Sequence, residues 1–286
     1  MMQLNIPNIR NDRNGYDVLG RFAREASSLL FDKLILNFAP CSFFEANMCA
    51  PLDAVLSLIR DNIVEIQLEG MSDAVKRILQ KNNFLEYWNI PSVRDSNGTV
   101  MPFRRFKVVE KTLFYSYLQQ FMSGHSLPVM SELLKKRFIE SLLEIFSNAA
   151  EHSQGASGIF VCGQYFPSKN RLDFSIADAG IGFRGNVRRR FGREDISSVA
   201  ALEWALKEGN TTRTGVVGGL GLKLLQDFVK LNRGKLQIIS RFAYHEYGEG
   251  KNSFEKLNYD FPGTCVNLEV NTADTSSYCL KSEHTS

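Results

Sequence analysis

The chain has 286 residues and a mass of 32.4 kDa, which is long for one domain and fits two. Apolar residues make up 44% and charged residues 23%, so we expect a folded globular protein and not a disordered chain. The formal net charge of only +3 argues against nucleic acid as a partner, because nucleic-acid-binding domains are far more basic.

The sequence also lacks the features of secreted and membrane proteins. No apolar run reaches the roughly 18 residues that a membrane-spanning helix needs, and the first residues do not resemble a signal peptide. Five cysteines at irregular spacing, none in a Cys-x-x-Cys pair, favour reduced thiols and make structural zinc improbable. We therefore expect a cytoplasmic protein that needs no membrane, disulfide or zinc to fold.

Residues 1–125 are predicted to form a smaller α/β domain, because strand and helix patterns alternate along them. In chain order we expect a weakly helical stretch at 20–30, a strand at 33–38, a helix at 44–60, a strand at 63–68, a helix at 73–80, a strand at 103–109 and a helix at 111–122. The turn-forming residues from Ser123 to Pro128 mark the predicted domain boundary.

Residues 126–272 are predicted to form the second domain. In chain order we expect a long helix at 130–152, strands at 157–164 and 171–177, helices at 195–208 and 221–232, and strands at 235–241 and 263–270. Residues 273–286, which are rich in Ser and Thr, are predicted to be a disordered tail.

A polar stripe follows one face of the predicted long helix. Ser141, Glu144, Asn148 and Glu151 lie at steps of three, four and three residues, so their side chains share that face. A stripe of this kind is also typical of a helix face in contact with solvent. Its meaning therefore depends on the motifs that follow.

Two glycine-containing motifs come after this helix. Asp178 ends a predicted strand and is followed by Gly180 and Gly182, a pattern that lets the backbone approach a ligand closely but also occurs in ordinary turns. Residues 215–222 carry several glycines directly before a helix, where backbone N–H groups and the helix dipole favour phosphate. The second motif is neither a Walker loop nor a Rossmann fingerprint, and a lid hinge is the alternative.

Together with Gly263-Thr264 at the start of the last strand, these motifs resemble, in order and spacing, the GHKL superfamily of ATP-binding domains. That superfamily includes gyrase, chaperone, histidine-kinase and mismatch-repair ATPases. Residues 138–153 look like its N box, Asp178 to Gly182 like its first glycine box, and Gly218 to Leu222 like its second. The resemblance covers about residues 130–270 and implies a Bergerat-type fold, a two-layer α+β sandwich.

The resemblance also implies a role for each matching residue. Asp178 would accept a hydrogen bond from the adenine amino group with support from Thr264, Asn148 would bind Mg²⁺, and Glu144 would act as the general base. Residues 183–217 would be a mobile lid, with 209–213 or Lys223 reaching the γ-phosphate. The implied ATP-binding residues are Asn148, Asp178, Gly180, Gly182, Gly218, Gly219, Leu220, Gly221 and Thr264.

The N box narrows the branch of the superfamily. Asn148 to His152 look most like the N boxes of histidine kinases and anti-sigma-factor kinases. We interpret His152 as structural, with a phosphoacceptor role as the alternative. His125 is followed by Ser-Leu-Pro and not by an acidic residue, so the dimerisation element of a complete sensor histidine kinase is not expected.

Residues 31–90 resemble, more weakly, a STAS domain, the fold of anti-sigma-factor antagonists. Such domains carry a phosphorylated Ser or Thr where their first helix begins. Here residues 43–49 contain no hydroxyl group, and Ser42 lies several residues early. We therefore expect a docking or dimerisation layer in place of a phosphoswitch.

The predicted function is that of an Mg²⁺-dependent ATP-binding protein. It would be a regulatory protein kinase, of the serine/threonine or histidine-kinase-like type, or a slow ATPase. Its expected partner is a regulatory or phosphoacceptor protein, and a homodimer is a further expected form of assembly. The alternative is an ATP-sensing binding module that changes partners with little or no catalysis. The mild charge disfavours a third hypothesis, a DNA-linked ATPase.

Overall fold

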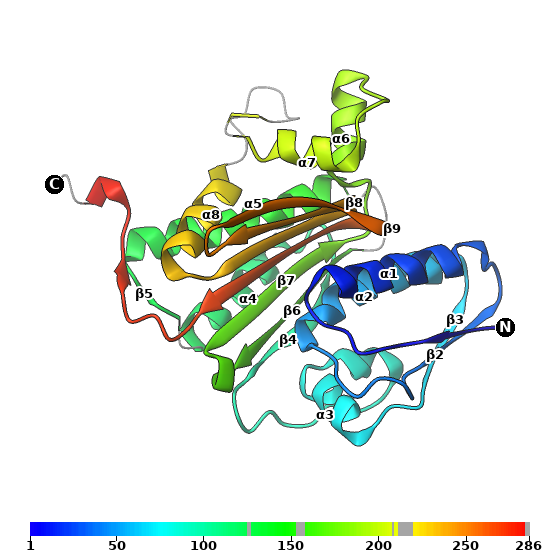
Figure 1. Cartoon of the computed structure of the whole chain (residues 1–286). Helices are drawn as coiled ribbons and strands as arrows, with labels where there is room; N and C mark the ends of the chain where they lie inside the picture. Colours follow the sequence, from blue (N-terminus) through cyan, green and yellow to red (C-terminus); the bar gives the residue numbers. More distant parts are fainter. Residues whose placement is uncertain (125–126, 153–157, 208, 211–219, 284–286) are drawn as a thin grey trace.

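The computed structural model describes residues 1–124, 127–152, 158–207, 209–210 and 220–283. The chain is a mixed α/β protein whose elements stack in layers (Figure 1). A small three-stranded sheet is followed by two helices, then by a five-stranded sheet, then by further helices on the opposite face of that sheet. None of the described helices has the length and apolar character that a membrane crossing requires.

The small sheet is entirely parallel, with the strand order β1-β2-β3. Because parallel neighbours need crossover connections, each pair of strands is joined by a helix. The strands are β1 (Met2–Asn5), β2 (Lys33–Asn37) and β3 (Glu65–Glu69), and the helices are α1 (Arg13–Glu25), α2 (Cys49–Asp61) and, after β3, α3 (Asp73–Lys81). The predicted strands and helices over 33–80 are confirmed, whereas β1 was too short to give a pattern.

The large sheet is antiparallel, with the strand order β4-β6-β7-β9-β8. Its strands are β4 (Val100–Phe106), β6 (Ile159–Phe166), β7 (Arg171–Asp178), β8 (Lys235–Gly248) and β9 (Lys251–Asn271). The predicted strands at 235–241 and 263–270 are confirmed but are only parts of β8 and β9. The two strands continue past an irregularity at Arg241 as one long hairpin.

The expected domain boundary at residue 125 differs from the structure. The strand β4 pairs with β6, so it belongs to the large sheet, and α4 (Lys111–Gly124) packs on the same sheet. Aromatic packing joins α4 to this sheet, since the ring centroid of Phe114 lies 5.5 Å from that of Phe106 on β4. The turn-forming residues at 123–128 are a local signal, whereas the extent of a sheet depends on pairing between strands that are distant in the chain.

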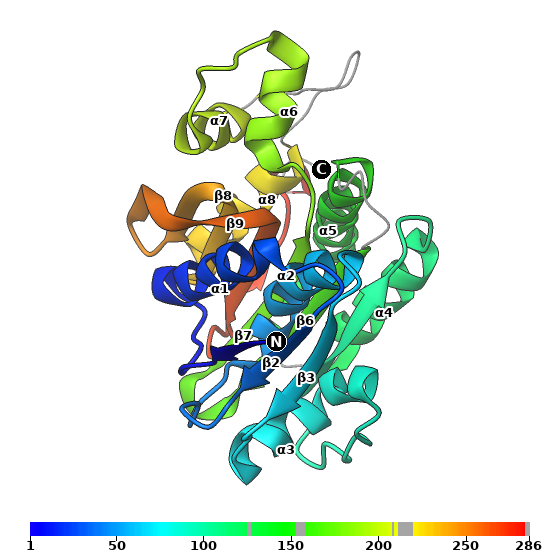
Figure 2. The same ribbon diagram turned by 90° about the vertical axis from the view of Figure 1, so that its right-hand side faces the viewer.

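Helices cover both faces of the large sheet. Helices α1 and α2 lie between it and the small sheet, while α4, α5 (Glu132–His152) and α8 (Leu220–Asn232) cover the other face (Figure 1). The predicted helices at 130–152 and 221–232 are therefore confirmed. Two further helices, α6 (Gly182–Phe191) and α7 (Ser198–Ala205), form an arm that projects from one end (Figure 2). The sequence predicted α7 but not α6, because few apolar residues mark α6.

The predicted disordered tail is wrong for residues 273–283. Strand β10 (Ser277–Tyr278) pairs in parallel with β5 (Val129–Met130), and the Ser131 N–H donates to the Tyr278 carbonyl over 2.8 Å. The Tyr278 ring packs on Phe228 of α8, and its hydroxyl donates to the Asp274 carboxylate. The polar composition of this segment concealed both its strand pairing and the packing of Tyr278.

Candidate functional site

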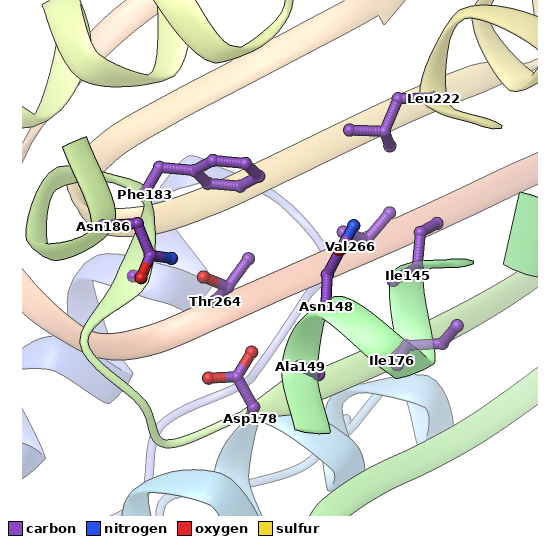
Figure 3. A pocket seen from close by; sticks show the side chains of 11 residues that line it. Ile145, Asn148, Ala149, Ile176, Asp178, Phe183, Asn186, Leu222, Thr264 and Val266 are labelled. Atoms are coloured by element: carbon purple, nitrogen blue, oxygen red, sulfur yellow. The ribbon is translucent and has the colours of Figure 1, made fainter. Parts of the chain in front are cut away.

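A pocket lies between the C-terminal half of α5, the end of β7 and the first turns of α6 and α8 (Figure 3). Its lining residues come from segments far apart in the chain: Ile145, Asn148, Ala149, Ile176, Asp178, Gly182, Phe183, Asn186, Leu222, Thr264 and Val266. Four predicted site residues are among them, namely Asn148, Asp178, Gly182 and Thr264. Strand pairing explains part of this, because β7 and β9 place Asp178 directly opposite Thr264.

Asp178 is a buried carboxylate at the end of β7, with 5% of its surface exposed. Its Oδ1 accepts a hydrogen bond from the Gly180 N–H over 2.7 Å. Figure 3 shows the carboxylate on the pocket side of the strand, close to Thr264. Gly180 therefore acts through its backbone, by orienting the Asp178 side chain.

Burial controls the ionisation of this carboxyl group. It raises the pKa of Asp178 from 3.8 to about 7, and hydrogen bonds from the backbone of Gly180 and Thr264 only partly oppose this effect. A buried aspartate without a cationic partner is costly to the folded state. Such a group is typical of binding sites, where a ligand supplies the missing interaction.

Glycines allow the backbone to cross closely beside Asp178. Gly263 has a φ of +105°, and a Cβ atom there would lie 2.0 Å from the Asp178 carbonyl oxygen. Gly182 has a φ of +69°, and a Cβ atom there would lie 2.5 Å from the Ser240 hydroxyl oxygen. Both positions therefore require glycine for conformation and for space.

Ser240, at the bend in β8, is a site residue that the sequence reasoning missed. Its hydroxyl accepts a hydrogen bond from the Phe183 N–H over 3.0 Å and lies 3.1 Å from the Thr264 hydroxyl. It thus joins the first turn of α6 to the residue that faces Asp178. No local signal marks it, because Ser240 meets Thr264 only through the pairing of β8 with β9.

Asn148 and Glu144 are one turn apart on α5 but face different surroundings. Asn148 lines the pocket, whereas the Glu144 carboxylate accepts a hydrogen bond from the Gly221 N–H over 3.1 Å. A Cβ atom at Gly221 would lie 2.5 Å from Glu144 Oε2 and 3.2 Å from the Ser141 Cα, so a larger residue there would displace the Glu144 carboxylate and crowd the backbone of α5. The predicted general base therefore contacts the start of α8 and does not line the pocket.

Several predicted residues cannot be placed. Gly218, Gly219, His125 and residues 211–213 lie outside the described part of the chain, as does the side chain of His152. Leu220 is the first residue of α8, which begins after the glycine-rich segment as predicted. Lys223 forms an ion pair with Asp227 over 2.9 Å, on an exposed face of the same helix.

The pocket combines apolar walls with few polar groups. Ile145, Ile176 and Val266 line it beside the Asp178 carboxylate and the Thr264 hydroxyl, a combination that suits a flat ring carrying a hydrogen-bond donor. Among the described residues, no three His, Cys, Asp or Glu side chains gather as a metal site. A cation beside Asn148 would therefore take its remaining oxygen ligands from a bound ligand and from water.

Comparison of the chain with protein-family models and with curated proteins gave no match.

Proposed function

We propose that this chain is an Mg²⁺-dependent ATP-binding protein of the GHKL class, with a Bergerat-type fold in its five-stranded part. It would act through protein contacts as a regulatory protein kinase or a slow ATPase. The observation that carries this proposal is the convergence of Asn148, Asp178 and Thr264, from three separate motifs, on one pocket.

The end of the pocket near Asp178 would hold the adenine ring. The ionised carboxylate would accept a hydrogen bond from the exocyclic amino group, and the Thr264 hydroxyl would support the same edge of the ring. Guanine carries a carbonyl oxygen at the corresponding position, which would repel the carboxylate. The raised pKa of Asp178 supports this assignment, because a donor from the ligand would stabilise the buried charge.

The other end of the pocket would hold the phosphates. The amide oxygen of Asn148 is a suitable ligand for Mg²⁺, which prefers oxygen donors and keeps phosphate and water ligands. The first turn of α8, from Leu220 onward, would contribute backbone N–H groups and the positive end of its dipole. Leu222 on the same turn already lines the pocket.

The position of Glu144 favours a second candidate function. Its carboxylate is occupied by the Gly221 N–H, so it would have to leave this hydrogen bond to activate water or an acceptor hydroxyl. An ATP-sensing module with little catalysis would need no such rearrangement. The two functions differ in the effect of Glu144→Gln, which would abolish turnover in an enzyme but leave partner binding intact in a sensor.

The N-terminal layer would be a STAS-like docking or dimerisation layer in either case. Asn47, near the start of α2, is fully buried and donates to the Ser175 hydroxyl over 3.2 Å and to Asn267 Oδ1 over 3.1 Å. Ser175 and Asn267 lie on β7 and β9, so this end of α2 is closed by the large sheet. A regulatory phosphate at this end would have no access, which supports a docking role.

Isothermal titration calorimetry with ATP, with and without Mg²⁺, tests the proposal. We expect saturable binding to the wild-type protein, weaker binding without Mg²⁺, and loss of binding in Asp178→Asn. The matched control is Asp173→Asn, a buried aspartate on the opposite face of the same strand. Equal ATP affinity in the wild type and Asp178→Asn would refute the adenine assignment, as would no binding to the wild type at all.

A further inference from the structure

The arm formed by α6 and α7 carries a concentrated positive charge. From Gly182 to Ala205, the ends of the two helices, the sequence has five cationic and three acidic residues, which gives +2 of the chain's net charge of +3. The rest of the chain, more than ten times as long, therefore carries a net charge of only +1. Helix α6 itself contains four arginines and no acidic residue: Arg184, Arg188, Arg189 and Arg190.

Two of these arginines are engaged within the arm, and two face solvent. Arg184 donates to the Ile196 carbonyl over 2.8 Å, and Arg188 forms an ion pair with Glu194. Arg189 and Arg190 are exposed, and no ion pair to either is found among the described residues. They thus form an uncompensated cationic surface at the C-terminal end of α6.

An exposed aromatic side chain lies beside Arg190, whose guanidinium carbon is 5.7 Å from the centroid of the Phe191 ring. Phe191 is 47% exposed and packs edge-on against Trp204 of α7, with 5.1 Å between ring centroids. The arm also has its own small core, made by Val187, Ile196 and Ala201. The surface is therefore held in place by packing within the arm.

We propose that Arg189, Arg190 and Phe191 form a docking surface for an acidic segment of a partner protein. Arginine pairs bidentately with carboxylates, and arginine and aromatic side chains are enriched at protein interfaces. A nucleic acid is disfavoured because the net charge of the whole chain is only +3, far below that of typical nucleic-acid-binding domains. A short acidic segment with one apolar residue beside Phe191 matches this combination of cationic and aromatic side chains.

The patch is connected to the pocket through a single helix. Gly182, Phe183 and Asn186 on the first turns of α6 line the pocket, and Arg189 and Arg190 follow one turn later. If the proposed function holds, a nucleotide that contacts the first turns biases the position of the patch, and partner binding changes nucleotide affinity by the same factor. The docking surface itself does not depend on that coupling.

Fluorescence anisotropy with two labelled probes tests the docking surface. The probes are poly-glutamate and a random copolymer of glutamate and tyrosine, each titrated with the full chain at low and at high salt. We expect binding that weakens with salt, tighter binding of the copolymer, and a loss of roughly tenfold or more in affinity in Arg189→Glu/Arg190→Glu. Phe191→Ala should bind both probes with the affinity that the wild type has for poly-glutamate, because it lacks the ring that contacts tyrosine.

The matched control is Lys76→Glu/Arg77→Glu, which makes the same charge change on an exposed face of α3, away from the arm (Figure 1). Equal losses in the two charge-reversal variants, or no binding of either probe, would overturn the docking surface. So would preferential binding of a single-stranded oligonucleotide to the same arginines, since this result would assign the patch to nucleic acid. Repeating the titration in the presence of ATP and Mg²⁺ separates the docking surface from the coupling. If the probes still bind through the arginines but their affinity does not change with nucleotide, the docking surface stands and only the coupling is refuted.

Discussion

Replacing Asp178 with asparagine is the most informative single perturbation. The carboxyl group is 5% exposed, and burial raises its pKa from 3.8 to about 7. The folded protein therefore keeps this proton to a higher pH than the unfolded chain does. Between these two pKa values the free energy of unfolding falls as pH rises, because the unfolded state binds fewer protons than the folded state.

The magnitude follows from the size of the shift. One pKa unit corresponds to about 1.36 kcal/mol, so above pH 7 the ionised Asp178 destabilises the folded protein by about 4 kcal/mol. Asparagine is neutral and keeps an oxygen to accept the Gly180 N–H, but its amide does not reproduce the second backbone hydrogen bond, from Thr264, at a cost of about 1 kcal/mol. We therefore expect Asp178→Asn to be about 3 kcal/mol more stable than the wild type at pH 8 and slightly less stable at pH 4.

Urea unfolding of both proteins across this pH range measures the effect. The control is again Asp173→Asn, whose carboxyl pKa is raised to about 8 by burial, so that variant should show a separate pH dependence without any loss of ATP binding. If Asp178→Asn is more stable than the wild type but no longer binds ATP, then Asp178 serves ligand binding at a cost in stability. A parallel pH dependence of wild type and Asp178→Asn would refute the reasoning, because it would show that Asp178 ionises normally.

Three further outcomes follow from the structure. Glu144→Gln should retain ATP binding within a factor of two while turnover falls at least about a hundredfold, as single-turnover kinetics would show; unchanged turnover would exclude the base. Ser240→Ala removes the hydroxyl that links α6 to Thr264 and should weaken ATP binding by roughly three- to tenfold in calorimetry. An unchanged affinity would make Ser240 purely structural. Asp53→Ala should lower the free energy of unfolding by about 3 kcal/mol, since the fully buried Asp53 carboxylate binds Arg105 over 2.6 Å. Urea unfolding would measure this, and a loss below about 1 kcal/mol would contradict it.

Local pattern predicted most helices and strands well. The apolar spacing of α5 and α8, and the Ser72 cap of α3, depend on residues a few positions apart and are readable from the sequence. The motifs likewise indicated Asn148, Asp178 and Thr264, all of which line the pocket. For these features, the relevant neighbours lie close along the chain or in a recognised motif order.

The tertiary structure decided what depends on distant neighbours. It placed β4 in the large sheet, extended β8 and β9 into one hairpin, and ordered the tail through Tyr278. It brought Ser240 to Thr264 and turned Glu144 toward Gly221 instead of the pocket. The sequence by itself determined which residues carry the proposed chemistry, because motif and periodicity are local. Only the fold decided which of them meet, because strand pairing and helix packing join segments that are far apart in the chain.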